Sequence, residues 1–241
     1  MDERRIREAY LIGDGALEKL KNARVALFGI GGVGSFCAEA LVRMGVGHIT
    51  FVDNDTVSVS NLNRQLVALS STVGEMKTEV MRRRALDIDP NVDIEVRNMF
   101  YLPETAESFD ISQFDCIVDA IDTVSAKFEL IKRANEAGIP IVSCMGTGNK
   151  LHPEMLEITD IYKTSVCPLA KVMRGKLRAA GIKKLRVVYS KEEPRKPHAD
   201  YEGKIELPEN KRQVPGSISF VPPTAGMLLA SEVFHILTGE K

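Results

Sequence analysis

The stretch Arg-Val-Ala-Leu-Phe-Gly-Ile-Gly-Gly-Val-Gly, residues 24–34, decides the fold that this sequence predicts. Residues 25–28 are typical of a short buried strand, and four glycines follow at once. Apolar residues then recur at steps of three and four from Val33 to Met44, which predicts a helix with one apolar face. A strand, a glycine turn and a helix in this order are typical of a nucleotide-binding unit.

The glycines of this turn are Gly29, Gly31, Gly32 and Gly34. Glycine lets the backbone approach a phosphate closely, and the N-terminus of the following helix offers unpaired N–H groups to it. The turn therefore predicts a nucleotide site. An ordinary tight strand-to-helix turn is the alternative for this stretch alone.

Strands and helices continue to alternate to about residue 145. Strands are predicted at residues 48–53, 92–96, 114–121 and 139–144, with helices at 73–88 and 123–138. We therefore expect an α/β fold with a Rossmann-like, mostly parallel sheet and helices on both faces, extended by a mixed C-terminal part. The elements predicted outside this region are helices at 2–12 and 16–21 around a turn at 13–15, strands at 154–158 and 185–189, helices at 168–181 and 222–237, and a mobile loop at 190–215.

The composition limits the function classes. The 241 residues carry a net charge of -1, so contact with nucleic acid needs a local basic patch. No stretch approaches the roughly 20 apolar residues that span a bilayer, and the first residues lack a signal-peptide core. The four cysteines form no CxxC pair, which argues against structural zinc and for reduced thiols. We expect a cytoplasmic protein without membrane contact.

Acidic residues lie where predicted parallel strands end. Asp53 comes about 20 residues beyond the glycines, where a Rossmann-type unit places an acid on the ribose hydroxyls, and Asp55 follows it. Asp122 lies just beyond the strand at 114–121, where a carboxylate can hold magnesium beside phosphates. Asp122 and Thr123 can also cap the next helix, and both roles can coexist.

Two further features do not belong to an ordinary dinucleotide unit. Residues 57–65 form a polar, amide-rich run with a single arginine, Arg64. Lys77 lies in the first turn of a predicted helix, where a cation is unfavourable for the helix dipole. An anionic partner for Lys77 is therefore one interpretation, and an exposed lysine is the other.

Five motifs now stand in a fixed order: GIGGVG (29–34), DND (53–55), SNLNRQ (60–65), VGEMK (73–77) and DAIDT (119–123). With these motifs the chain resembles the ubiquitin-activating-enzyme superfamily, in particular its ThiF/MoeB/HesA group of adenylating enzymes. The resemblance implies ATP and Mg²⁺ as cofactors. It also implies a Rossmann-like ATP-binding adenylation region at residues 1–145, and a C-terminal substrate-side extension at 146–241 packed on the same domain.

The resemblance implies roles for single residues. Gly32 would approach the α-phosphate, and Asp53 would bind the ribose. Asn61, Arg64 and Lys77 would neutralise the triphosphate and the leaving pyrophosphate. An arginine of the N-terminal helix would reach into the partner subunit's site, which implies a homodimer. The implied catalytic residues are Arg7, Arg64, Lys77 and Asp122, with Asp122 as the metal ligand. The other implied nucleotide-binding residues are Gly29, Gly31, Gly34, Asp55, Gln65 and Thr123.

Residues 4–13, 160–174 and 215–231 are more narrowly similar to the tRNA threonylcarbamoyladenosine dehydratases of this group. This branch implies that ATP converts the carboxylate of the threonylcarbamoyl group into an acyl-adenylate. A nearby group of the same modification then displaces AMP, which cyclises the side chain with net loss of water. The tRNA is the implied partner, and a sulfur-transfer protein is a second one that the resemblance raises.

Three other functions stay open on the sequence. An adenylyltransferase for the C-terminus of a ubiquitin-like sulfur-carrier protein is disfavoured, because the paired zinc cysteines of such enzymes are missing. A nicotinamide-dependent oxidoreductase has no use for the polar run at 60–65 or for Lys77. A non-catalytic nucleotide-binding module would bind ATP without releasing pyrophosphate.

Two further features are a candidate nucleophile and a basic helix face. Cys167 is the only cysteine expected outside the predicted core, so it is the one candidate for a nucleophilic thiol, with a small buried hydrophobe as the alternative. The helix at 168–181 and the residues after it carry a basic face that suits a tRNA backbone, with a solvated helix face as the alternative. The residues of that face are Lys171, Arg174, Arg178, Lys183, Lys184 and Arg186.

Overall fold

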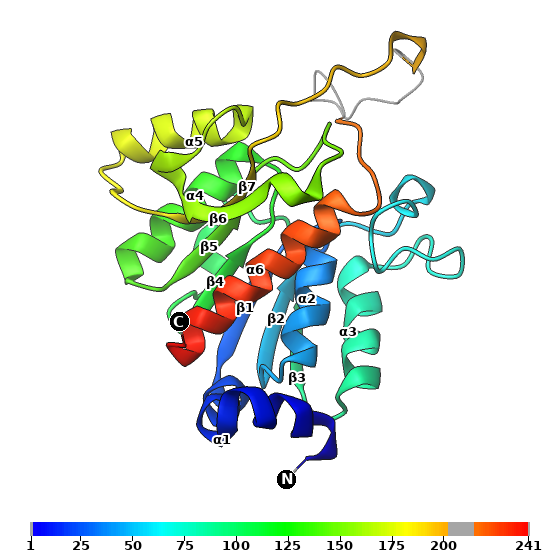
Figure 1. Cartoon of the computed structure of the whole chain (residues 1–241), viewed down its shortest axis with the longest axis vertical. Helices are drawn as coiled ribbons and strands as arrows, with labels where there is room; N and C mark the ends of the chain where they lie inside the picture. The colour runs from blue at the N-terminus through cyan, green and yellow to red at the C-terminus, as the bar shows by residue number, and fades with distance from the viewer. Residues whose placement is uncertain (1, 202–214, 241) are drawn as a thin grey trace.

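The computed structural model describes residues 2–201 and 215–240, and a seven-stranded sheet forms its centre (Figure 1). The strand order is β3-β2-β1-β4-β5-β7-β6, and only the β6–β7 pair is antiparallel among these neighbours. The predicted fold class is confirmed. The strands are β1 (Arg24–Phe28), β2 (His48–Val52), β3 (Asp93–Arg97), β4 (Cys116–Asp119), β5 (Ile141–Cys144), β6 (Leu156–Asp160) and β7 (Arg186–Ser190).

Helices cover both faces of the sheet, with α2, α3 and α6 on one face and α4 and α5 on the other (Figure 1). Successive residues of a strand point to opposite faces, so Val25 and Leu27 pack under the first group while Ala26 and Phe28 face α4. Both faces are buried, which explains why the central strands are continuous apolar runs. The helices are α1 (Ile6–Asn22), α2 (Gly34–Arg43), α3 (Lys77–Ile88), α4 (Val124–Ala137), α5 (Pro168–Ala179) and α6 (Val221–Thr238).

The N-terminal segment is broken at a single glycine. The sequence predicted two short helices around a turn at residues 13–15, and α1 is interrupted only at Gly13, with φ 74° and ψ 166°. Glycine adopts this left-handed φ without steric cost. Arg5 ties the start of α1 to the rest of the fold, because its guanidinium donates to the Val42 carbonyl at 3.0 Å and to Asp89 at 2.9 Å.

The sequence of residues 100–113 predicts a polar connection with one helical turn, but the interior of the β3–β4 connection is less polar than that. One short helical turn, Ala106–Ser108, agrees with the prediction. Tyr101 and Phe109, however, are buried and meet the Phe28 ring edge-on, with centroids 4.9 and 5.1 Å away. The prediction of a polar connection is wrong in this respect, because these rings cover the end of β1. Of the loop predicted at 190–215, residues 202–214 lie outside the described residues.

Among the described residues, no helix has both the length and the apolar character needed to cross a lipid bilayer.

A buried carboxylate joins two of the helices that cover the sheet. Glu39 of α2 accepts hydrogen bonds from Arg84 of α3 at 2.6 and 2.9 Å and from Arg43 at 2.7 Å. Burial opposes ionisation of Glu39, but these hydrogen bonds outweigh it and hold the pKa of the carboxyl below its ordinary value. Charged hydrogen bonds of this kind connect α2 to α3 behind the glycine turn.

The pH dependence of stability tests this link. Because the folded-state pKa of Glu39 is depressed, its contribution is present above the unfolded-state pKa and is lost as pH falls through the folded-state pKa. We expect Glu39→Gln to lower the unfolding free energy at pH 7 by about 1–3 kcal/mol, and the deficit to shrink in acid. Denaturant unfolding at several pH values measures this deficit, with the exposed Glu104→Gln as control. A deficit that does not depend on pH would contradict the assignment.

Candidate nucleotide site

The carboxyl ends of β1, β2 and β4 meet at the glycine turn. The Gly29 N–H donates to the Val52 carbonyl at 2.8 Å, and the Ala120 N–H donates to the Phe28 carbonyl at 2.9 Å. Gly29 has φ 90°, and a Cβ there would lie 2.8 Å from the Ala120 carbonyl oxygen. A Cβ on Gly34 would overlap the Gly29 carbonyl. The backbone path itself therefore requires glycine at both positions.

Asp53 is fixed against the turn by its own hydrogen bonds. One carboxylate oxygen accepts the Ile30 N–H at 2.6 Å, and the other accepts the Asp55 N–H at 2.8 Å. Burial raises the pKa of Asp53 above its ordinary value, although the charge of Lys77 and these two N–H groups oppose the shift. Asp53 thus lies against the glycine turn, at the carboxyl end of β2.

Lys77 has the anionic partner that its unfavourable place in a helix indicated. It is the first residue of α3, its side chain is 5% exposed, and its Nζ lies 2.7 Å from a carboxylate oxygen of Asp55. Asp55 is itself 60% exposed. The buried ammonium group of this pair is close enough to Asp53 for its charge to lower the pKa of that carboxyl, against the effect of burial.

The polar run at residues 57–65 packs onto the glycine turn. Asn61 is buried, and its Oδ1 accepts the Ser58 N–H at 3.1 Å, which closes a short helical turn, Val59–Asn61. A Cβ on Gly31 would be 3.9 Å from the Gln65 amide nitrogen. The Gln65 amide oxygen is buried without a hydrogen-bond partner among the described residues. A buried acceptor without a partner in the described ranges, next to a glycine loop, is a position at which a ligand or a water can donate a hydrogen bond.

Arg64 is the second cation of the site. Its Cγ lies 3.4 Å from the position of a Cβ on Gly32, so its stem rests against the glycine turn. Burial lowers the pKa of Arg64 from its ordinary value. Its guanidinium donates to the Ser60 carbonyl at 2.9 Å and to the Asn63 amide oxygen at 2.8 Å, and no carboxylate pairs with it in the described part of the chain. A partly desolvated guanidinium without a counter-ion favours binding of an anion.

Asp122 and Thr123 occupy the turn between β4 and α4. Asp122 is exposed, and the Thr123 hydroxyl donates to its carboxylate at 3.4 Å. No group of three potential metal-ligating side chains occurs among residues 2–201 and 215–240. One carboxylate suits Mg²⁺ when phosphate oxygens and water supply the remaining ligands, so Asp122 fits a metal that arrives with a nucleotide.

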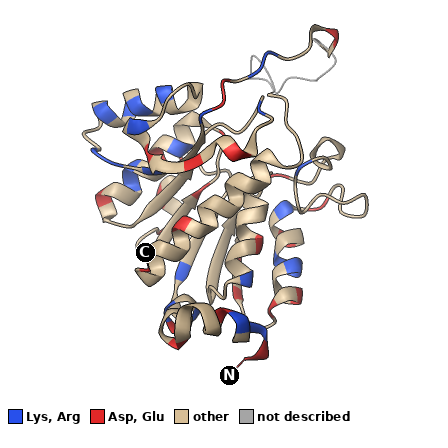
Figure 2. Cartoon of the chain, in the orientation of Figure 1, with Lys and Arg blue, Asp and Glu red and all other residues tan. Residues whose placement is uncertain are grey.

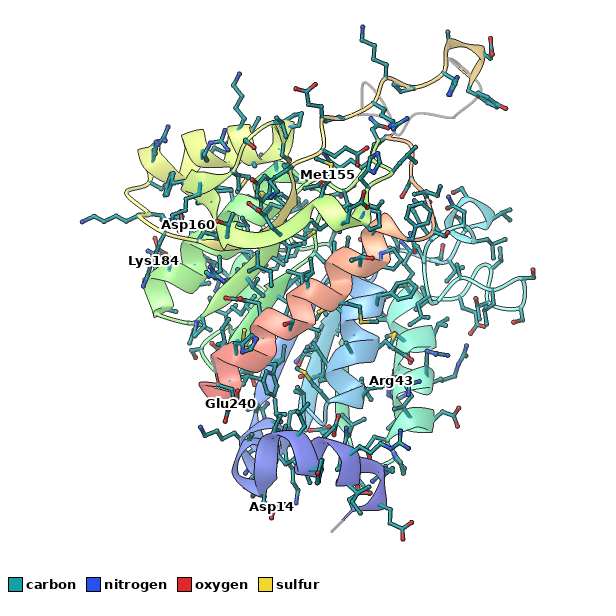
Figure 3. The ribbon with its side chains drawn as sticks, viewed as in Figure 1. Asp14, Arg43, Met155, Asp160, Lys184 and Glu240 are labelled. Atoms are coloured by element: carbon teal, nitrogen blue, oxygen red, sulfur yellow. The ribbon has the colours of Figure 1, made fainter. Side chains whose placement is uncertain are left out.

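The structure does not bring Arg7 into the site of its own chain. Arg5 bonds to the carbonyl of Val42 at the C-terminal end of α2, near Arg43 (Figure 3), whereas the glycine turn precedes the first residue of α2. A ten-residue helix is about 15 Å long, and Arg7 lies at its far end. Arg7 is exposed, and its side chain forms no ion pair with any residue in the described ranges.

Cys167 lies inside the core, whereas the sequence predicted that it lies outside. It is 2% exposed, caps the N-terminus of α5 and belongs to an apolar cluster with Met145 and Ala170. The amphipathic pattern of α5 begins one residue later, which is why the sequence left Cys167 outside the core. The buried-hydrophobe interpretation fits its place.

Three residues beneath the site were missed. Asp119 ends β4, Lys127 lies on α4 and Ser143 lies on β5, and their polar side-chain atoms bond to one another in the core. The signal in the sequence was weak but present. Lys127 lies four and seven residues before Ile131 and Ala134, which places a charged residue on the apolar face of its helix.

A doubly covered α/β sheet with a glycine turn, strand-end carboxylates and two nearby cations, of which Arg64 lacks a carboxylate partner among the described residues, defines a nucleotide-binding protein of the Rossmann-like class. The chain belongs to the ThiF family, whose sequence pattern matches residues 3–241. This confirms the family that the five motifs indicated.

Individual proteins show what the chain is similar to. The chain is 44% identical over 235 residues to the tRNA threonylcarbamoyladenosine dehydratase of Bacillus subtilis, which covers 94% of this chain and 91% of that protein. The Escherichia coli dehydratase TcdA, solved in complex with ATP, superposes with a TM-score of 0.87 at 32% identity, covering 98% and 94% of the two chains. The E. coli protein MccB, at 21% identity and a TM-score of 0.68, shares the fold.

The glycine turn yields a stability prediction. We expect Gly29→Ala to lower the unfolding free energy by about 2–4 kcal/mol, because it combines a strained φ with overlap onto the Ala120 carbonyl. The control is Gly175→Ala in the interior of α5, where a new Cβ meets nothing within 4 Å. That change should raise stability by about 0.5–1 kcal/mol. Equal effects in denaturant unfolding would refute the steric account.

Proposed function

We propose that the chain is an ATP-dependent tRNA threonylcarbamoyladenosine dehydratase that works through an acyl-adenylate. The observation that carries the proposal is the similarity to dehydratases over nearly the whole chain, 44% identity with one bacterial relative and a TM-score of 0.87 with another solved in complex with ATP. The glycine turn with Arg64 and Lys77 supplies the chemistry that such a reaction needs. The paired zinc cysteines of a carrier-protein adenylyltransferase are missing from this sequence.

ATP would lie along the carboxyl ends of β1, β2 and β4. Gly32 and the N-terminus of α2 would receive the α-phosphate, and Asp53 the ribose. Arg64 and Lys77 would neutralise the triphosphate, with Lys77 exchanging Asp55 for phosphate oxygens. The other nucleotide contacts in this proposal are Gly29, Gly31, Gly34, Asn61, Gln65 and Thr123. Asp122 would hold Mg²⁺, which shields the charge that develops on the pyrophosphate.

The reaction follows from charge and position. The substrate carboxylate attacks the α-phosphorus, the bond to the β-phosphate oxygen breaks, and pyrophosphate leaves while the acyl-adenylate forms. A nucleophile of the same modified base then attacks the activated carbonyl and releases AMP, which carries away one carboxylate oxygen. Neither step requires an enzyme thiol. The chain contributes positioning and neutralisation of charge, so losing a cation should slow the reaction more than it weakens binding.

Mass spectrometry of tRNA nucleosides tests the activity. With ATP and magnesium, the protein should remove one water from threonylcarbamoyladenosine in tRNA. Arg64→Ala should slow this reaction by about 100-fold or more, because it removes charge that is needed as pyrophosphate leaves. The matched control is Arg82→Ala on the exposed face of α3. An unchanged nucleoside mass with pyrophosphate still released would instead point to a carrier-protein substrate.

A second copy of the chain would complete the site. Arg7 lies a helix length from the glycine turn, and beside it α1 exposes Tyr10 (96% exposed) and Leu11 (83%). The segment after β2 exposes a second apolar set near the site: Val59, Leu62, Leu69 and Val73. In a two-fold dimer, α1 of each copy would cover this segment of the other, which brings Arg7 to the partner's phosphates. A sulfur-transfer partner stays a prediction of the family resemblance.

Mixing two inactive variants tests the shared site. Arg7→Ala and Arg64→Ala should each be inactive alone. In mixed dimers one site regains both arginines, so random reassociation should restore about a quarter of wild-type activity. The rate of water loss after co-refolding or co-expression measures this. If Arg7 acted within its own chain, no mixture would recover activity.

Residues 146–241 would face the tRNA. Lysine and arginine gather over α5 and the turn after it (Figure 2), where Lys171, Lys183 and Lys184 are exposed. Two members of the predicted basic face are tied to the fold instead. Arg174 donates to the Thr164 carbonyl at 3.1 Å, and Arg186 binds Glu232 at 2.6 and 2.9 Å. The patch that suits a phosphate backbone is therefore narrower than the sequence predicted.

A further inference from the structure

A fully buried ion pair lies directly beneath the nucleotide site. The Lys127 Nζ is 2.7 Å from a carboxylate oxygen of Asp119, and both side chains are 0% exposed. The same Nζ donates to the Ser143 hydroxyl at 3.2 Å and to the Cys144 carbonyl at 2.9 Å. These contacts use all three protons of the ammonium group. One α4 side chain therefore joins the ends of β4 and β5.

Asp119 connects this cluster to the turn above it. The oxygen that receives Lys127 also accepts the Ser143 hydroxyl at 2.5 Å, and the other oxygen accepts the Ile121 N–H at 3.1 Å. The carboxylate thus holds the backbone of the turn that leads to Asp122. The preceding residue of that turn, Ala120, is the one whose carbonyl oxygen would lie 2.8 Å from a Cβ on Gly29.

Burial at this depth is costly for a structural pair. Two charges lose their hydration, and an apolar pair of similar volume is often as stable or more stable. A charged cluster that is completely satisfied and lies under a glycine turn therefore calls for a reason other than stability. Its contacts supply one, because it fixes three backbone points at the edge of the sheet: Ile121, Cys144 and, through Ala120, Gly29.

We infer that Asp119, Lys127 and Ser143 are positioning residues of the adenylation reaction. They hold the turn 120–122 against the glycine loop and lock it to the end of β5, where the loop to the substrate-side residues begins. The inference rests on the proposed function. None of the three side chains touches the reactants in this account. They set the place of Asp122 and of the glycine backbone relative to the group that attacks the α-phosphorus.

The test compares four variants by kinetics and by amide hydrogen exchange. Lys127→Met strands a buried carboxylate, whereas Asp119→Asn combined with Lys127→Met leaves no buried charge. Ser143→Ala removes a single hydroxyl. Its matched control is Thr50→Val, a buried hydroxyl of β2 that bonds to Glu95 at 3.3 Å, away from the turn. For each variant, kcat, the KM for ATP, the magnesium dependence and the melting temperature are measured.

We expect the double variant to recover most of the melting temperature that Lys127→Met loses, because the unpaired charge is gone. Its kcat should nevertheless stay about 100-fold below wild type, since a shift of about 1 Å in a reacting group costs that much. Ser143→Ala should lower kcat by about tenfold and raise the magnesium requirement at an unchanged KM for ATP. Thr50→Val should leave kcat at the wild-type level.

Two results would overturn the inference. One is a double variant whose kcat returns together with its melting temperature, which is the behaviour of a merely structural pair. The other is unchanged hydrogen exchange at the amides of residues 120–123 in Lys127→Met, because the turn would then not depend on the cluster. A third combination separates the two proposals. If exchange at these amides is faster in Lys127→Met than in the wild type, but the wild-type chain removes no water from tRNA, the proposed function fails. The hold of the cluster on the turn then still stands.

Discussion

The close approach of two backbones at the ends of β1 and β4 governs the whole site. Gly29 adopts a left-handed φ beneath the Ala120 carbonyl, and Gly34 starts α2 against the Gly29 carbonyl. No side chain fits at either position. The contact aims the N-terminus of α2 at the edge of the sheet where β1 and β4 end. Every polar residue of the site is placed relative to this contact.

The carboxylates and the cations around the turn differ in how they are held. Carboxylates at the strand ends are fixed by backbone N–H groups, as at Asp53, whereas the cations are desolvated and incompletely paired. Arg64 has no carboxylate partner in the described chain, and Lys77 is paired only with an exposed one. The partly desolvated guanidinium of Arg64 is the group at the turn that favours an anion. The buried Asp119–Lys127 pair below it is, in contrast, fully satisfied and holds the geometry.

The strands and the carboxylates that follow them were predictable from the sequence, because buried parallel strands are apolar runs and their carboxyl ends must share one edge. These two rules are enough to predict that Asp53 and Asp122 lie at the same edge of the sheet. The contacts of Lys127 were not predictable, because they depend on which helix covers which strand. Tyr101 and Phe109 lie in a connection between strands, so the sequence did not indicate that their rings cover the end of β1. The burial of Cys167 depended on how α5 packs. Arg186 does not contribute a free charge to the basic face, because α6 places Glu232 beside it. This contact joins residues that are 46 positions apart in the sequence.

The central claim is that this turn directs a carboxylate to the α-phosphorus of ATP. Transfer of an oxygen isotope from that carboxylate tests this claim most directly. The threonylcarbamoyl carboxylate of the tRNA is labelled with ¹⁸O and converted by the protein with ATP and magnesium, and the nucleotide products are analysed by mass spectrometry. The account predicts one ¹⁸O atom in AMP and none in pyrophosphate. Label in inorganic phosphate, with ADP as the other product, would show attack at the γ-phosphorus and contradict it.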